Sequence, residues 1–195
     1  PEELPPTPFM RWLEGPGSMF YFDYSALSPE RPAGGSHFYT CQVSLKRALL
    51  FRTSLFDPDF RYASHEDLEL GHRLEQAGMK LWYQPDLVAM HWHHLAFTDV
   101  VRRIYTMGYS APTYWAKVPD PAGPVRRMTK DAIRLLAASP LARPFLQRLL
   151  SSTTLRSGHA YWRGLLTLAY WVGLADAWRG RPRMSIPNTP ELKPC

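Results

Sequence analysis

The stretch SHEDLELGHRLEQAG, residues 64–78, decides the fold predicted for this chain. Apolar residues recur along it at helical spacing, and Gly78 stands where a helix commonly ends. Glu66 and Asp67 fall in the first turn, where free backbone N–H groups and the positive end of the helix dipole favour negative charge. The stretch therefore predicts a helix with an acidic first turn.

A carboxylate held rigidly at such a turn can accept the proton of a hydroxyl group as that oxygen attacks an electrophile. Acidic residues are also common in first turns because they cap helices, and Ser64 with Asp67 has the spacing of a capping box. On spacing alone, both the catalytic and the capping interpretation stay open.

The segments around this helix predict alternating strands and helices. Residues 38–43 predict a short strand, after which Ser44 caps a helix that runs through Leu50. Residues 87–93 predict a second strand from their alternating pattern. Further helices are expected after Thr98 and over residues 158–179.

Three stretches, in this order along the chain, resemble elements of the family 2 glycosyltransferases. They are FYTCQVSLKR (38–47), FDPDF (56–60) and HEDLELGHRL (65–74). The family shows an N-x-S-x-x-R strand-to-helix element, then F-D-E-x-F, then an E-D-x-E-L-x-x-R-L helix. The resemblance extends over residues 38–111, and the ordered set is more specific than any one piece.

This resemblance implies an α/β fold, namely the C-terminal part of a GT-A fold with a mixed sheet, followed by C-terminal helices. Residues 1–118 are then the acceptor-side half of the transferase domain. Residues 119–195 are a helical extension, for which an interfacial contact with a membrane is one alternative.

The resemblance also implies an inverting transfer of a sugar from a nucleotide-diphosphate sugar to a glycan or lipid-linked acceptor. Asp67 is then the general base, and Glu66 orients the acceptor or the base. The family's D-x-D element, which holds Mg²⁺ or Mn²⁺ with the diphosphate, is missing. Residues 57–59 have that spacing but stand at the family's F-D-E-x-F position. We expect the missing element before residue 1, and this chain to be inactive alone.

Two further groups are candidates for the donor side. His91 and His93 project from one face of the second predicted strand, where they can contact a metal or a phosphate; capping of the strand end is the alternative. Arg102 and Arg103 can bind pyrophosphate, or lie as solvated arginines on a helix. Gln42 replaces the family's usual Asn, which puts the hydrogen bond of that position in doubt.

Composition bounds the remaining functions. The chain has 195 residues, of which 45% are hydrophobic, and 23 Lys and Arg against 17 Asp and Glu give a net charge of +6. This balance suits phosphate-bearing or lipid partners, whereas no dense basic run interleaved with aromatics indicates nucleic acid. Cys41 and Cys195 form no disulfide framework, so a reducing, cytoplasmic location is expected, with the inner face of the membrane as an alternative.

The last predicted helix has an uncharged stretch of twelve residues, 164–175, shorter than the roughly 20 that a membrane span needs. Its aromatic residues fit either core packing or an interfacial anchor. Two other functions stay open beside the transferase: a non-catalytic module that binds acceptor or membrane, and a metal hydrolase using His91, His93 and Asp67. Tight metal binding without nucleotide distinguishes the hydrolase.

Overall fold

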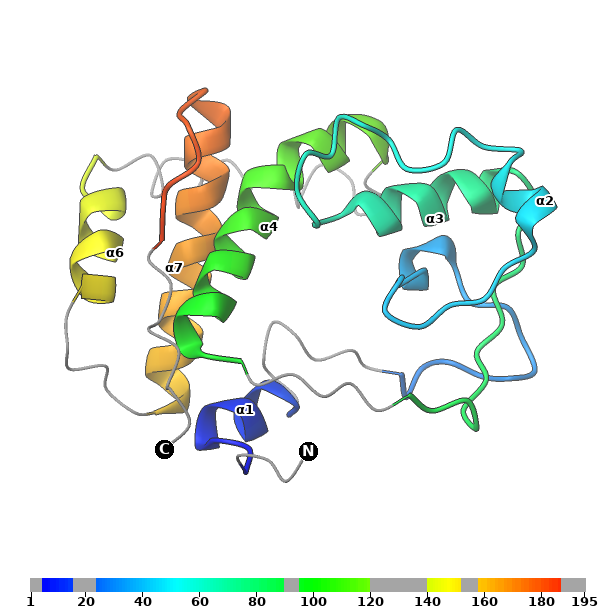
Figure 1. Cartoon of the computed structure of the whole chain (residues 1–195), viewed down its shortest axis with the longest axis horizontal. Coiled ribbons are helices and arrows are strands. Elements are labelled where there is room, and N and C mark those ends of the chain that lie inside the picture. The colour runs from blue at the N-terminus through cyan, green and yellow to red at the C-terminus, as the bar shows by residue number, and fades with distance from the viewer. Residues whose placement is uncertain (1–4, 16–23, 90–94, 120–139, 152–157, 187–195) are drawn as a thin grey trace. The chain divides into compact units, whose positions relative to one another are not determined.

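The computed structural model describes residues 5–15, 24–89, 95–119, 140–151 and 158–186. In chain order their helices are α1 (Pro8–Leu13), the 3-10 turn η1 (Gly35–His37), α2 (Arg47–Leu50), α3 (Glu66–Gln76), α4 (Phe97–Lys117), α6 (Ala142–Ser151) and α7 (His159–Trp178) (Figure 1). The chain divides into two compact units. Unit 1 comprises Pro1–Tyr21, His93–Pro112 and Pro121–Cys195, and unit 2 comprises Phe22–Trp92 and Thr113–Asp120.

The predicted mixed sheet is absent from the part of the chain that the structure describes. Residues 38–43 form turns and irregular structure, as do residues 87–89 of the second predicted strand. The one β pairing in the described ranges is an isolated antiparallel bridge, in which the Ala33 N–H donates to the Leu81 carbonyl at 2.8 Å. A strand needs a neighbouring strand to satisfy its backbone groups, and none of these segments supplies one. The predicted α/β GT-A fold is therefore wrong for these residues.

Unit 1 is helical, and its core lies between α1, the N-terminal part of α4, α6 and α7. Fully buried apolar side chains come from each of the longer helices: Val101 and Ile104 from α4, Leu146 from α6, Leu166 and Ala169 from α7. These residues recur at helical spacing, which is why the predicted helices after Thr98 and over 158–179 are confirmed. The buried residues of α4 include Val101, Ile104, Tyr105 and Gly108, which recur on one side of the helix.

Two glycines let α4 and α7 approach closely within unit 1. A Cβ atom at Gly108 would collide with the carbonyl oxygen of Tyr170, and one at Gly173 would collide with that of Tyr105. The backbone of each helix therefore fills the space that a side chain on the other would need. This contact also brings the buried Tyr105 beside the last turns of α7.

A polar group of unit 1 is buried at this point. The Tyr105 hydroxyl donates to Asp176 Oδ2 at 2.8 Å and accepts from the Met184 N–H at 2.8 Å. The other carboxylate oxygen, Oδ1, forms an ion pair with Arg143 at 3.2 Å. Burial raises the pKa of the Tyr105 hydroxyl, so it stays protonated and remains a donor. The bonds satisfy a carboxylate that is only 1% exposed, and they fix α4, α6, α7 and the following segment together.

Unit 2 is built on α3. Gly35 of η1 and Gly71 of α3 are in such close contact that a Cβ on either would collide with the carbonyl oxygen of the other. Phe38, Leu70 and Leu74 form the buried apolar cluster of this unit, with partly buried aliphatic side chains around it. Gly71 is thus needed by packing, although the sequence offers it only as a weak helix former.

The predicted α3 helix is confirmed, and its ends differ in how well they were predicted. It ends before Gly78, whose φ of 91° only glycine adopts readily, as the sequence indicates. At the other end the N-cap is His65, with φ 67°, and it makes no side-chain capping bond. The capping box of Ser64 and Asp67 is therefore wrong.

No helix in the described ranges is long and apolar enough to cross a membrane. In α7, Trp162 is buried in the core, so this predicted interfacial anchor packs inside unit 1. Tyr161, Tyr170 and Trp171 are half-buried, and Trp178 is exposed. The division of the chain into residues 1–118 and 119–195 stays a prediction.

Candidate functional site

The Asp67 carboxylate lies in the first turn of α3 and is half-buried. Its Oδ1 atom accepts from the N–H of Leu68 at 2.9 Å, and its Oδ2 atom accepts from the N–H of Thr40 at 3.4 Å. The second bond joins α3 to a segment 27 positions earlier in the chain. Asp67 forms no ion pair within the described residues. Two backbone donors therefore orient this carboxylate, while part of it remains open to solvent.

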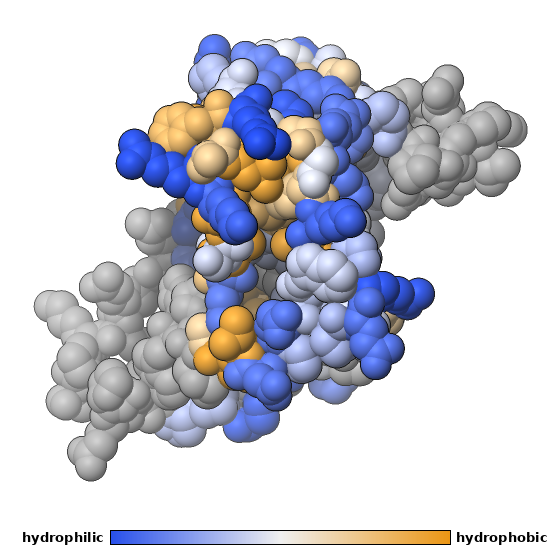
Figure 2. Space-filling model, turned by 90° about the vertical axis from the view of Figure 1, so that its right-hand side faces the viewer, coloured by the Kyte–Doolittle hydropathy of each residue, from blue (hydrophilic) through white to orange (hydrophobic). Residues whose placement is uncertain are grey.

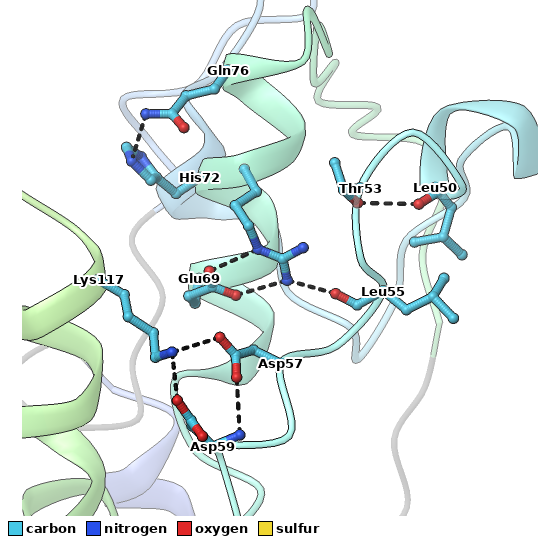
Figure 3. Close-up of polar contacts among 10 residues, drawn as sticks. Leu50, Thr53, Leu55, Asp57, Asp59, Glu69, His72, Gln76 and Lys117 are labelled. Carbon is cyan, nitrogen blue, oxygen red and sulfur yellow. Dashed lines mark hydrogen bonds and ion pairs between the residues drawn. The ribbon is translucent and has the colours of Figure 1, made fainter.

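Glu66 begins α3 and is also half-buried, so the structure places both predicted catalytic residues in the same turn. Glu69 completes the acidic first turn, but it is only 4% exposed and is engaged by Arg73 through two bonds of 2.7 and 2.8 Å. The two residues stand four apart on α3, a spacing at which side chains meet on the surface of a helix (Figure 3). Of the three acidic residues, Glu69 is thus structural.

His65 is a site residue to which sequence reasoning gave no role. Its ring stacks on that of Tyr114 with centroids 5.1 Å apart, and its Nδ1 atom is hydrogen-bonded to the Ser64 hydroxyl at 3.0 Å. Burial lowers the pKa of His65 to about 4, and the opposing attraction of Asp67 does not cancel this effect. The imidazole is therefore neutral at pH 7. The left-handed backbone of His65 is not readable from the sequence; only its place before the acidic pair draws attention.

The Tyr39 side chain lies within electrostatic range of Asp67, and Tyr24 lies within electrostatic range of Tyr39. Burial raises the pKa of Tyr39, with smaller contributions from Tyr24, Asp67 and Tyr114. The Tyr39 hydroxyl is thus a protonated donor within electrostatic range of the carboxylate. The Tyr24 and Tyr83 rings stack almost in parallel, with centroids 5.7 Å apart and an interplanar angle of 6°. Aromatic faces and phenolic hydroxyls together suit a ligand with apolar faces and hydroxyl groups.

Gln42 stabilises the segment that carries these groups. Its Nε2 atom donates to the Leu87 carbonyl at 3.0 Å. This bond joins the chain just after Thr40 to the chain just after Tyr83. The Gln42 side-chain amide therefore joins two segments of unit 2 that are 45 residues apart.

Asp57 and Asp59, which have the spacing of a D-x-D element, are both bound by Lys117, whose Nζ lies 2.7 Å from a carboxylate oxygen of each (Figure 3). The hydrogen bond from Lys117 is the main cause of the lowered pKa of Asp57, and the two carboxylates raise the pKa of Lys117. A lysine ammonium thus occupies the position that a cation would need.

No hydrogen bond or ion pair within the described residues joins Asp67 to the residues predicted for the donor side. These residues are His91, His93, Arg102 and Arg103. Arg102 pairs with Asp99 at 2.9 Å and donates to the Ile186 carbonyl at 3.1 Å within unit 1, which is a structural role. Arg103 is exposed on the same helix and also has a partner. His91 and His93 lie outside the described residues. Across those residues no group of three or more His, Cys, Asp or Glu side chains is arranged to hold a metal ion.

Comparisons of the chain with protein-family models, with curated proteins and with solved structures found no match.

Proposed function

We propose that this chain supplies the acceptor-binding and base-carrying part of an inverting glycosyltransferase. The observation that carries the proposal is the Asp67 carboxylate, which two backbone N–H groups orient at the start of α3 while part of it stays accessible. Support also comes from the ordered resemblance over residues 38–111. The proposal does not depend on the mixed sheet, which the described residues lack.

In the proposed reaction an acceptor sugar lies beside Asp67. The carboxylate accepts the proton of the acceptor hydroxyl as that oxygen attacks the anomeric carbon of a nucleotide-diphosphate sugar. The bond from the anomeric carbon to the diphosphate oxygen breaks, and the nucleoside diphosphate leaves with that electron pair. The neutral His65 beside Asp67 does not compete for the negative charge as an imidazolium would.

The described residues do not fit the divalent metal that the resemblance implies. The acidic pair Asp57 and Asp59 is bound to Lys117, and the remaining described ligands form no cluster. Mg²⁺ or Mn²⁺ therefore stays a prediction from the resemblance, and no step above depends on it.

Asp67→Asn tests the proposed base. The intact protein is incubated with UDP-, GDP- and dTDP-sugars, Mn²⁺ and a panel of sugar acceptors, and release of nucleoside diphosphate is measured. We expect the variant to lose roughly 10²–10⁴-fold in kcat, the usual contribution of a positioned base. Donor binding, measured by isothermal titration, should be unchanged.

Asp86→Asn is the matched control, because it makes the same chemical change at an exposed turn. It should retain full turnover. Full turnover in Asp67→Asn would refute the assignment. Binding of a nucleotide-sugar donor by residues 1–195 alone would contradict the proposal that this chain supplies only the acceptor-binding and base-carrying part. Acceptor binding without turnover by any donor would favour a non-catalytic binding module.

A further inference from the structure

A surface of unit 2 combines exposed apolar and basic side chains in one short stretch. Phe51 is 60% exposed, Phe56 50% and Leu55 42%, which is unusual for side chains of this size. Three exposed basic residues belong to the same stretch. We call this set the basic–apolar surface, and its members are Lys46, Arg47, Phe51, Arg52, Leu55 and Phe56.

The face of the molecule that carries α2 is turned to the viewer in Figure 2, where apolar side chains gather among strongly hydrophilic ones. The Arg47 guanidinium lies over the Phe51 ring, 5.3 Å from its centre. The Leu55 carbonyl accepts a hydrogen bond from Arg73 of α3 (Figure 3). Since Arg73 is itself held by Glu69, the loop that presents Leu55 and Phe56 is attached to the main helix of unit 2.

The charge of this surface is positive. No acidic residue occurs between Lys46 and Phe56. The acidic residues that follow, Asp57 and Asp59, carry two negative charges, of which Lys117 balances one, so the three cations of the surface still exceed the anions beside them. Lys46, Arg47 and Arg52 form no ion pair with any residue that the structure describes.

We propose that the basic–apolar surface docks this protein on a bilayer that contains anionic phospholipids. Exposed aromatic and aliphatic side chains enter the boundary between headgroups and acyl chains, and the cations around them bind the anionic headgroups. A nucleic acid duplex would offer phosphates to the cations, but its stacked bases would leave Phe51, Leu55 and Phe56 without an apolar partner. The proposal is independent of the proposed transferase activity. It also places the contact on unit 2, whereas the sequence suggested the last helix, where Trp162 is buried.

Sedimentation of the intact protein with vesicles tests this docking. Vesicles of phosphatidylcholine alone are compared with vesicles of phosphatidylcholine and phosphatidylserine. We expect binding to the mixed vesicles only, and a steep loss as salt is raised, because salt screens exposed charges. Each cation near an anionic surface contributes roughly a factor of five to the partition coefficient. The triple variant Lys46→Gln, Arg47→Gln, Arg52→Gln should therefore bind on the order of 100-fold more weakly.

Phe51→Ser should weaken binding by roughly tenfold, because this exposed ring no longer enters the bilayer. The matched control is Arg11→Gln, Lys80→Gln, Arg163→Gln, which removes the same net charge from exposed positions elsewhere. This control variant should lose far less vesicle binding than the Lys46→Gln, Arg47→Gln, Arg52→Gln variant. Equal binding to both kinds of vesicle, or an equal loss in the control, would overturn the proposal. So would the absence of vesicle binding together with self-association that Phe51→Ser abolishes, since the surface would then contact a second copy of the chain.

Discussion

His65 and Asp67 stand two residues apart at the start of α3, but their surroundings differ: the His65 ring is packed against Tyr114, and the Asp67 carboxylate accepts two backbone hydrogen bonds. Burial of the His65 ring, which stacks on Tyr114, disfavours the imidazolium form and outweighs the attraction of Asp67. Asp67 instead has two backbone donors that suit an anion. A neutral histidine places no positive charge beside the oriented carboxylate that we propose as the base.

The lowered pKa of His65 predicts that unit 2 becomes less stable in mild acid. In the unfolded chain the histidine titrates near 6.5, and in the folded chain near 4. As pH falls, the unfolded state therefore binds the proton first, and stability that is complete above pH 6.5 is lost progressively down to about pH 4. Between pH 7 and pH 5 the loss from this group is about 2 kcal/mol.

His65→Asn is the variant of choice, because Asn also tolerates the left-handed backbone at this position. The free energy of unfolding is measured in urea at both pH values for both proteins. Between pH 7 and pH 5 the free energy of unfolding of the wild type should fall by about 2 kcal/mol more than that of the variant. A pH dependence identical in the two proteins would show that His65 is not held neutral.

At this turn the sequence predicted the helix and its acidic first turn, but not the residue that caps it. The acidic pair and the helix it begins could be inferred from spacing, because a helix makes its hydrogen bonds within its own segment. Local pattern makes Ser64 a candidate cap, whereas in the structure the N-cap is His65, whose ring stacks on Tyr114. The approach of Tyr39 to Asp67 depends on chain segments 28 residues apart, which no local pattern encodes.

At the scale of elements, the same reasoning explains why the predicted helices α3, α4 and α7 form, whereas the predicted strands are absent from the described residues. The apolar period of α4 needs only a partner surface, which α7 supplies. The strands predicted over 38–43 and 87–93 need neighbouring strands, and in the described residues only the Ala33 to Leu81 bridge forms. Alternation of side chains shows that a segment is able to pair, but it does not show that a partner exists.

The close contact between α4 and α7 predicts that alanine substitutions at different glycines have very different effects on stability. Gly108→Ala and Gly173→Ala should each lower the free energy of unfolding by several kcal/mol, because the new methyl group collides with backbone that cannot rotate away. Gly164→Ala on the same helix α7 is the control. Nothing lies within 4 Å of its added Cβ, so alanine should be neutral or stabilising by up to about 1 kcal/mol.

Urea denaturation followed by circular dichroism measures all three glycine variants under the same conditions. A small effect of Gly108→Ala, comparable with that of Gly164→Ala, would mean that the two helices do not approach as closely as the structure shows. A large loss in Gly164→Ala would instead point to a contact on the exposed side of α7.

At the scale of the whole molecule, the two units differ in how much apolar surface they bury. The core of unit 1 joins buried side chains from α1, α4, α6 and α7. The buried cluster of unit 2 is limited to Phe38, Leu70 and Leu74 in the described residues. Since hydrophobic stabilisation scales with buried apolar area, unit 2 is expected to be the less stable unit.

We therefore expect unit 2 to unfold at a lower temperature than unit 1. Leu74→Ala and Leu166→Ala form a matched pair, because both side chains are fully buried and each belongs to one unit. Each substitution should cost about 2–5 kcal/mol in its own unit. By calorimetry, Leu74→Ala should lower only the first transition and Leu166→Ala only the second. In hydrogen-exchange measurements, the buried amide protons of α3 should likewise exchange faster than those of α7. A single transition that both substitutions shift equally would contradict this order, because the two cores would then unfold as one cooperative structure.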